Sequence, residues 1–121
     1  MSNRAYMAID ASVAAAAAQT KDIDVGSADT LLVAWLVTDS GATADLGATT
    51  VRPYTAFSDS AAGILIENTI PAVSVAAVAK TGAQTSKLDR YDVRGLERVR
   101  LSMTNAAGGA KTLQAHVYLD N

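Results

Sequence analysis

Two segments in the last third of the chain alternate apolar and polar residues with the period of a β-strand. The first spans Glu97–Thr104 and places on one face Val99, Leu101 and Met103. The second spans Lys111–Leu119 and places on one face Leu113, Ala115, Val117 and Leu119. Successive side chains of a strand point to opposite faces, so each segment requires one buried and one exposed side. Because the Gly-rich stretch 105–110 joins them, the pattern predicts a β-hairpin.

The segment Thr30–Thr38 differs because it is apolar on both faces. One face carries Leu31, Val33, Trp35 and Val37, and the other carries Leu32, Ala34 and Leu36. A sandwich strand normally has a polar outer face. We therefore expect both faces to be covered, the second either by the N-terminal segment or by another subunit. Leu32 and Leu36 are candidate interface residues.

Between these segments, short β-rich stretches are separated by Gly, Asp, Ser and Asn. Strands are predicted at Thr49–Phe57, Ile64–Ile70, Val73–Ala79 and Arg90–Val93, with a loop at Lys80–Leu88. Pro53 cannot donate a ladder hydrogen bond, which predicts an edge or bulged strand there. The fold class that follows is an all-β, antiparallel β-sandwich that resembles a jelly roll.

A similar strand entry occurs twice in the sequence. Asp24-Val25-Gly26 precedes the strand Thr30–Thr38, and Asp92-Val93-Arg94-Gly95 precedes the strand Glu97–Thr104. The repeat is degenerate. It predicts a two-sheet sandwich in which each half contains one copy of this turn before a strand.

The first twenty residues allow two interpretations. Tyr6, Ile9 and Val13 recur at helical spacing, and Ala14–Ala18 has high helix propensity with Ser12 as a possible N-cap. The same stretch also fits an extended arm or an edge strand, because Ala is tolerated in any conformation. We favour the arm or edge strand for residues 1–20, followed by a single β-sandwich domain over 21–121.

Composition points to a thin core. The chain has 121 residues, of which 50% are hydrophobic, but much of that fraction is alanine. An Ala methyl buries a fraction of the area that a Leu buries. Thin cores are often completed by a neighbouring subunit, so we expect oligomerisation. No apolar run is long enough to span a bilayer, and we expect no membrane association.

The charge is small in total but uneven along the chain. The formal net charge is −2, with acids in excess over residues 1–79 and bases in excess over residues 80–121. Arg94, Arg98 and Arg100 belong to the basic part and are candidate docking residues for another subunit or an acidic partner. Neighbouring acids offset this charge, so specific nucleic-acid binding is not expected.

The residues that enzymes and metal sites need are missing. There is no cysteine and one histidine, His116, which excludes a zinc site and, without a nucleophile elbow, a serine triad. The acids of Asp22-x-Asp24 and Asp39–Asp45 lack the spacing of an EF-hand. We expect no enzymatic activity and no cofactor. His116 and its strand neighbour Tyr118 are interpreted as surface residues of an interface.

One stretch carries a family resemblance. The segment Asp92–Leu101, the Gly/Ala turn that follows it and the strand Leu113–Leu119 resemble the head decoration, or cement, proteins of tailed phages. The Cys-free composition, rich in Ala, Thr, Ser and Gly, is similar too. The resemblance implies a virion protein on the capsid exterior that contacts the major capsid protein. It also implies a homo-oligomer, often a trimer, that stabilises the head against the pressure of the packaged DNA.

Two other functions fit the same sequence. A tail or neck connector subunit of a phage would share the fold and the composition. A β-sandwich module that binds carbohydrate or another ligand is a further alternative, although such modules usually present a platform of exposed aromatic side chains.

Overall fold

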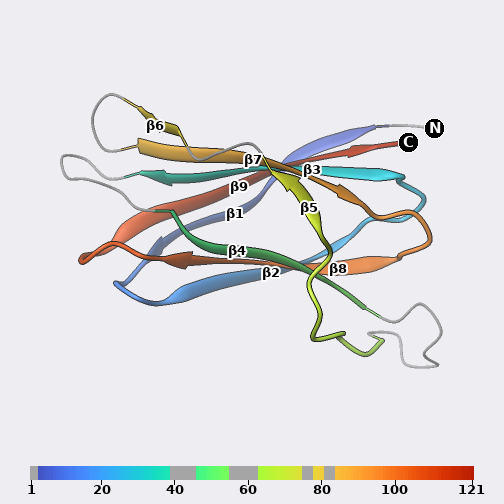
Figure 1. The fold of residues 1–121 in the computed structure, drawn as a ribbon, viewed down its shortest axis with the longest axis horizontal. Coiled ribbons are helices and arrows are strands. Elements are labelled where there is room, and N and C mark those ends of the chain that lie inside the picture. Colours follow the sequence, from blue (N-terminus) through green and yellow to red (C-terminus); the bar gives the residue numbers. More distant parts are fainter. Residues whose placement is uncertain (1–2, 39–45, 55–62, 75–77, 81–83) are drawn as a thin grey trace.

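The computed structural model describes residues 3–38, 46–54, 63–74, 78–80 and 84–121. In these residues the chain forms two antiparallel sheets that pack against each other (Figure 1). The strands are β1 (Arg4–Val13), β2 (Ala18–Asp24), β3 (Thr30–Thr38), β4 (Leu46–Pro53), β5 (Ala72–Ser74), β6 (Val78–Lys80), β7 (Gln84–Asp92), β8 (Arg98–Asn105) and β9 (Lys111–Asp120). The predicted antiparallel β-sandwich is confirmed.

The order of the strands resembles that of a jelly roll. The six-stranded sheet runs β1-β9-β3-β7-β5, with β6 also paired to β7, and the three-stranded sheet runs β2-β8-β4. Consecutive strands from β1 to β4, and again from β7 to β9, alternate between the two sheets. Consecutive strands in these two stretches therefore lie in opposite sheets, as in the two Greek keys of a jelly roll.

Residues 4–13 of the N-terminal segment form an edge strand, which confirms the favoured interpretation over the helix there. The predicted boundary at residue 20 is wrong, because β2 begins at Ala18 in the other sheet. β1 pairs with β9 along its length, with a register irregularity between Met7 and Ile9. Ile9 and Val13 are buried in the core. The Ala-rich stretch turns the chain from one sheet to the other, and Ala16 takes a left-handed φ of 62° there. Pairing with β9 outweighs the helix propensity of alanine because it satisfies the backbone and buries both apolar side chains.

The predicted hairpin between the last two strands is wrong. β8 belongs to the three-stranded sheet and β9 to the six-stranded sheet, so the stretch 106–110 crosses the sandwich. Asn105 holds this crossing together. Its buried Nδ2 donates to the carbonyl oxygens of Val13 and Gly109, both at 2.9 Å. The alternation of apolar and polar residues determines which side of a strand is buried. It is the same for two strands in opposite sheets as for two paired strands, so it could not distinguish a crossing from a hairpin.

Other boundaries also differ from prediction. Of the strand predicted at Ile64–Ile70, only Leu65 makes an isolated bridge, to Tyr54. The predicted loop Lys80–Leu88 is wrong at Lys80, which ends β6, and over 84–88, because β7 begins at Gln84 and pairs with β3 over nine residues. Pro53 ends β4, an edge strand of the three-stranded sheet, as predicted. Residues 55–57 and 75–77 of the predicted strands lie outside the described residues.

The core lies between the sheets and confirms the predicted inward faces. β3 has the predicted bounds, and its alternate residues are fully buried: Leu31, Val33, Trp35 and Val37. Facing them are Val99, Leu101 and Met103 from β8. From β9 come Leu113, Ala115, Val117 and Leu119.

The repeated strand entry corresponds to two equivalent turns at the same end of the sandwich. The Val25 amide donates to the Glu97 carbonyl at 2.9 Å, and the Val93 amide donates to the Asp29 carbonyl at 3.0 Å. Both valines are buried. The two turns therefore tie each other together by reciprocal hydrogen bonds, which agrees with one copy of the entry in each half.

Candidate interaction surfaces

The predicted interface residues separate onto different parts of the molecule. Four of them gather on the outward side of the six-stranded sheet: Leu32, Leu36, His116 and Tyr118. Arg98 and Arg100 lie on the outward side of the three-stranded sheet, because their neighbour Val99 faces the core. Arg94 lies in the turn between β7 and β8. The set therefore does not form one surface.

The outward side of the six-stranded sheet, here called the outer face, is largely apolar at its centre. Each of the three apolar outward residues of β3 lies between one residue of β9 and one of β7. Leu32 lies between Tyr118 and Arg90, Ala34 between His116 and Leu88, and Leu36 between Gln114 and Ser86. β1 extends the rows, with Ala5 beside Tyr118 and Met7 beside His116. His116 contacts the side-chain oxygen of Gln114 at 3.4 Å.

Several apolar side chains of the outer face are open to solvent. The exposed fractions are 38% for Tyr118, 40% for Leu88, 44% for Met7 and 78% for Val73. Leu32, Ala34 and Leu36 are half-buried by their neighbours. The N-terminal segment does not cover them as one alternative predicted, because β1 lies at the edge of the sheet, beyond β9.

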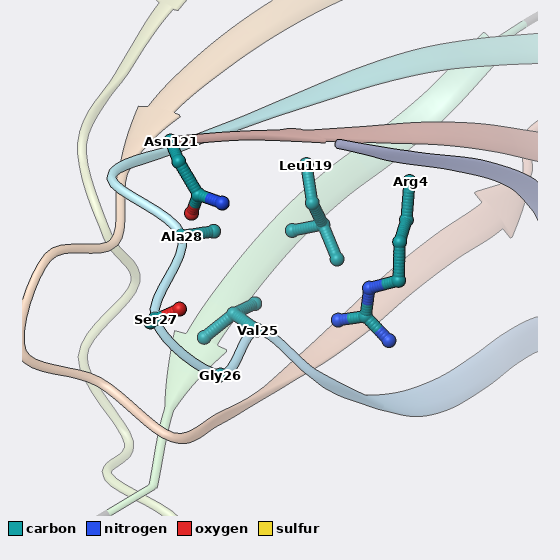
Figure 2. A pocket seen from close by; sticks show the side chains of 7 residues that line it. All are labelled: Arg4, Val25, Gly26, Ser27, Ala28, Leu119 and Asn121. Carbon is teal, nitrogen blue, oxygen red and sulfur yellow. The ribbon is translucent and has the colours of Figure 1, made fainter. Parts of the chain in front are cut away.

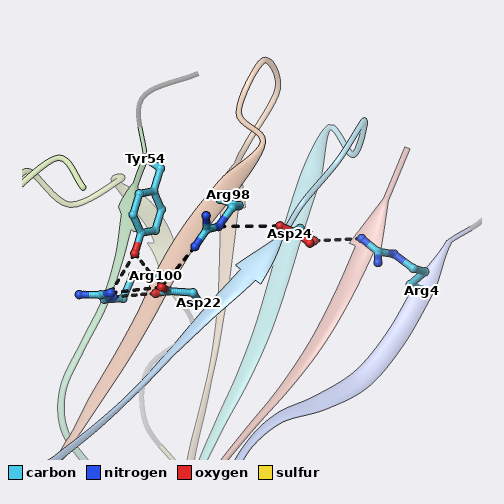
Figure 3. Close-up of polar contacts among 6 residues, drawn as sticks. All are labelled: Arg4, Asp22, Asp24, Tyr54, Arg98 and Arg100. Carbon is cyan, nitrogen blue, oxygen red and sulfur yellow. Dashed lines mark hydrogen bonds and ion pairs between the residues drawn. The ribbon is translucent and has the colours of Figure 1, made fainter. Parts of the chain in front are cut away.

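Arg98 and Arg100 form an ion-pair network with β2 (Figure 3). Asp22 accepts hydrogen bonds from Arg100 Nε at 2.7 Å, from Arg100 Nη2 at 3.1 Å and from the Tyr54 hydroxyl at 2.7 Å. Arg98 Nη2 lies 3.5 Å from the same carboxylate, and the Arg98 guanidinium lies 4.6 Å from the centroid of the Tyr54 ring. Asp24 is a further ion-pair partner of Arg98, at 3.9 Å.

The network neutralises the predicted basic surface. The Arg100 hydrogen bonds lower the pKa of Asp22, and Asp22 in turn raises the pKa of Arg100. Burial, followed by the hydrogen bond to Asp22, raises the pKa of Tyr54. Asp22 pairs with Arg100 across the sheet, and Asp24 pairs with Arg98. The sequence shows that Asp22 and Asp24 share one face of a strand, as do Arg98 and Arg100, because each pair is two residues apart. It does not show that β2 pairs with β8.

Arg94 is also occupied within the chain. Its Nε and Nη2 donate to the two carboxylate oxygens of Asp92, at 3.1 and 2.9 Å. The Arg94 contact lowers the pKa of Asp92 although both side chains are exposed. Such a fork-to-carboxylate pair holds the turn and leaves little net charge for a partner.

A buried carboxylate lies at the border of the core. Asp89 is 1% exposed, and its Oδ2 accepts from Trp35 Nε1 and the Tyr91 hydroxyl, both at 3.1 Å. Lys87 Nζ lies 3.3 Å from the same oxygen and donates to Thr49 Oγ1 at 2.6 Å. Asp89 Oδ1 is buried and has no hydrogen-bond partner among the residues described. Burial, followed by the nearby charge of Asp89, raises the pKa of Tyr91.

Asp89 borders a cleft of about 200 Å³ between β4, β7 and the segment 69–72. Hydroxyl and ammonium groups line it together with apolar surface: Thr49, Thr50, Thr69, Lys87 and Tyr91. The carboxylate and the ammonium balance each other in charge. Such a lining suits a small neutral molecule that carries hydroxyl groups better than it suits a free ion.

A second cleft, of about 310 Å³, lies at the end of the sandwich beside both chain ends (Figure 2). It is lined by the turn Val25–Ala28 with Arg4, Leu119 and Asn121. Arg4 Nη2 donates to the Asp24 carbonyl oxygen at 3.0 Å. One arginine beside a turn makes a polar recess, but the described residues that line the cleft bring no acid and base together for proton transfer.

The described part of the chain holds no group of three or more His, Cys, Asp or Glu residues arranged for a metal ion. Asp22 and Asp24 are engaged by arginines, and the predicted loop Asp39–Asp45 lies outside the described residues. Within those residues no helix has the length and apolarity to cross a bilayer. No protein-family model matches the chain, and a search of curated proteins finds no relative.

Proposed function

We propose that the chain is a virion structural protein, a decoration or cement subunit that binds the major capsid protein on the outside of a phage head. The resemblance of Asp92–Leu101 and Leu113–Leu119 to such proteins motivates the proposal. A jelly-roll-like sandwich is one of the folds from which viral capsid domains are built. Because one fold serves many functions, this is support by analogy.

The observation that carries the proposal is the exposed apolar outer face. Monomeric soluble proteins rarely expose large contiguous apolar patches, and those that occur often mark interaction sites. Here Met7, Leu88 and Tyr118 surround half-buried residues of the central strand. Many such contacts, repeated by the symmetry of a shell, add avidity without a single strong site.

The charges on the opposite side of the molecule are consistent with this mode of binding. Arg98 and Arg100 are neutralised by Asp22 and Asp24. Attachment through shape and apolar contact should depend only weakly on salt, whereas attachment by an unpaired basic surface should weaken steeply.

Co-sedimentation with empty shells of the major capsid protein from the same virus tests the proposal. We expect the protein to pellet with the shells, and Leu88→Asp to reduce pelleting at least tenfold. Thr20→Asp is the matched control, because Thr20 is an exposed residue on the opposite sheet. A monomer in light-scattering chromatography at micromolar concentration that also fails to pellet would refute the proposal. Labelling of intact virions separates a head subunit from a tail or neck connector.

A second candidate function is favoured by the cleft at Asp89. We propose, as the alternative, a module that binds a small hydroxylated ligand such as a carbohydrate. Lys87 and the Thr49 hydroxyl line the cleft and can form hydrogen bonds with ligand hydroxyls. A glycan array, followed by NMR titration of any hit against wild type and Thr49→Val, tests this candidate. An array without hits removes it.

A further inference from the structure

The outer face carries opposite charges at two opposite corners. Arg90, on β7, is exposed in the row of Leu32, and Asp10, on β1, is exposed in the row of Leu36. The two residues are three strand spacings and four residues apart. At ~4.8 Å per strand and ~3.4 Å per residue, they mark a nearly square area with ~14 Å sides. Its diagonal is ~20 Å, so the two charges do not pair within one chain.

The rest of this square is neutral. The other two corners are small residues, Ala5 and Ser86, and Ala34 lies beside His116 near the centre. Asp10 accepts a hydrogen bond from Gln114 at 3.2 Å. Among the described residues, Arg90 forms no ion pair within 4.0 Å.

Two further acids lie one row beyond the square, at the strand ends. They are Asp92, which is already paired with Arg94, and Asp120. Because these two acids lie outside the square, they would not contact the same square of a second copy placed on top of it.

We propose that the outer face binds a second copy of this chain in an isologous dimer. The two-fold axis lies in the plane of the face and runs along the diagonal from Ala5 to Ser86. Rotation about it exchanges the charged corners, so that Arg90 of each copy meets Asp10 of the other. Because the square is turned about its diagonal, the strands of the two copies cross at about 90°, the orthogonal class of sheet packing.

The same rotation matches the apolar side chains. Tyr118 of one copy falls against Met7 of the second copy, and Leu36 falls against Leu88. The small residues Ala5 and Ser86 lie on the axis and allow the two faces to approach. The side chains of Tyr118, Met7, Leu36 and Leu88 are therefore all buried between the two copies, which removes their apolar surface from water.

Other axes through the same centre match the charges less well. An axis along the other diagonal stacks Arg90 on Arg90 and Asp10 on Asp10 of the second copy, and like charges oppose that arrangement. An axis parallel to the strands sets Arg90 against Ala5 of the second copy. The corner charges thus select one two-fold arrangement for two copies of this chain.

The size of the face sets the expected affinity. Four strands and three rows cover roughly 19 by 20 Å, or about 800 Å² over both copies. This area is below that of standard specific interfaces and is typical of weak contacts, so we expect a dissociation constant in the high micromolar range. The inference rests on the same outer face as the proposed function, so dimerisation and capsid binding would compete for this face. It names a dimer where the phage resemblance implies a trimer.

Sedimentation equilibrium of the purified protein tests the dimer without capsid shells, so its failure is distinct from failure of the proposed function. The single variants Arg90→Asp and Asp10→Arg should each weaken dimerisation at least tenfold. Combining them restores opposite charges with the signs exchanged, and the double variant should return to within about threefold of wild type. Lys21→Asp, which makes the same change of charge at an exposed residue of the opposite sheet, is the control and should leave dimerisation unchanged. Thermal melting by circular dichroism confirms that each variant folds.

Crosslinking provides a second measurement that does not depend on charge. The chain has no cysteine, so Ala5→Cys introduces a single thiol on the proposed axis. Stacked sheets lie ~10 Å apart, a gap that a short bifunctional maleimide spans. We expect Ala5→Cys to form a covalent dimer and Thr20→Cys, on the opposite sheet, to remain monomeric. A monomer, a trimer or a double variant no better than the single ones would overturn the proposal.

Discussion

Replacement of the buried carboxylate, Asp89→Ala, is the perturbation whose size the structure defines best. Asp89 Oδ2 accepts hydrogen bonds from Trp35 Nε1 and from the Tyr91 hydroxyl, both at 3.1 Å. Trp35 is fully buried and Tyr91 is 2% exposed, so both donors are shielded from bulk water in the intact protein. Truncation leaves two buried donors without a partner.

The expected cost follows from these two donors. An unsatisfied buried donor costs about 1–3 kcal/mol, so the pair costs about 4 kcal/mol. Lys87 adds little, because its side chain is 21% exposed and keeps its hydrogen bond to Thr49. A domain of this length has a total stability of about 6–18 kcal/mol, and the variant should therefore fold but unfold at lower denaturant concentration.

Urea unfolding followed by Trp35 fluorescence measures the effect. Asp92→Ala is the matched control: it removes a 63% exposed carboxylate from the same strand and should cost less than about 1 kcal/mol. A double-mutant cycle with Trp35→Phe, followed by circular dichroism, should give a coupling of about 1.5–3 kcal/mol with Asp89→Ala. Additive costs, or a loss below about 1 kcal/mol for Asp89→Ala, would show that this reasoning is wrong.

Three other outcomes are expected. Because Arg100 lowers the pKa of Asp22, the stability from this pair is present above about pH 4 and is lost as pH falls through the depressed pKa. In Asp22→Asn, the free energy of unfolding measured at acidic pH should therefore depend less on pH. The raised pKa of Tyr91 keeps its hydroxyl protonated in the fold, so stability should fall above about pH 10, and less so in Tyr91→Phe. In Gly47→Ala the added methyl would meet the Thr104 carbonyl, and denaturant midpoints should show a loss of about 1–3 kcal/mol, whereas equal stability would contradict the close approach.

The sequence by itself determined the local character of most of the sandwich. Strand alternation depends only on neighbouring residues, so the inward faces of β8 and β9 and the bounds of β3 were predictable. Pro53 marked an edge strand because its missing N–H is a property of the residue itself. The apolar outward residues Leu32 and Leu36 were visible in the same way.

Tertiary structure alone decided which strands are neighbours. Strands β8 and β9 have the pattern of a hairpin but lie in different sheets, because alternation identifies the buried side and not the partner. The polar strand β7 forms because β3 supplies its hydrogen bonds, and Asp22 meets Arg100 because β2 pairs with β8. Strand pairing satisfies backbone N–H and C=O groups, which are nearly the same in every residue. The side chains therefore determine the partner of each strand only through the packing of the whole sandwich around one core.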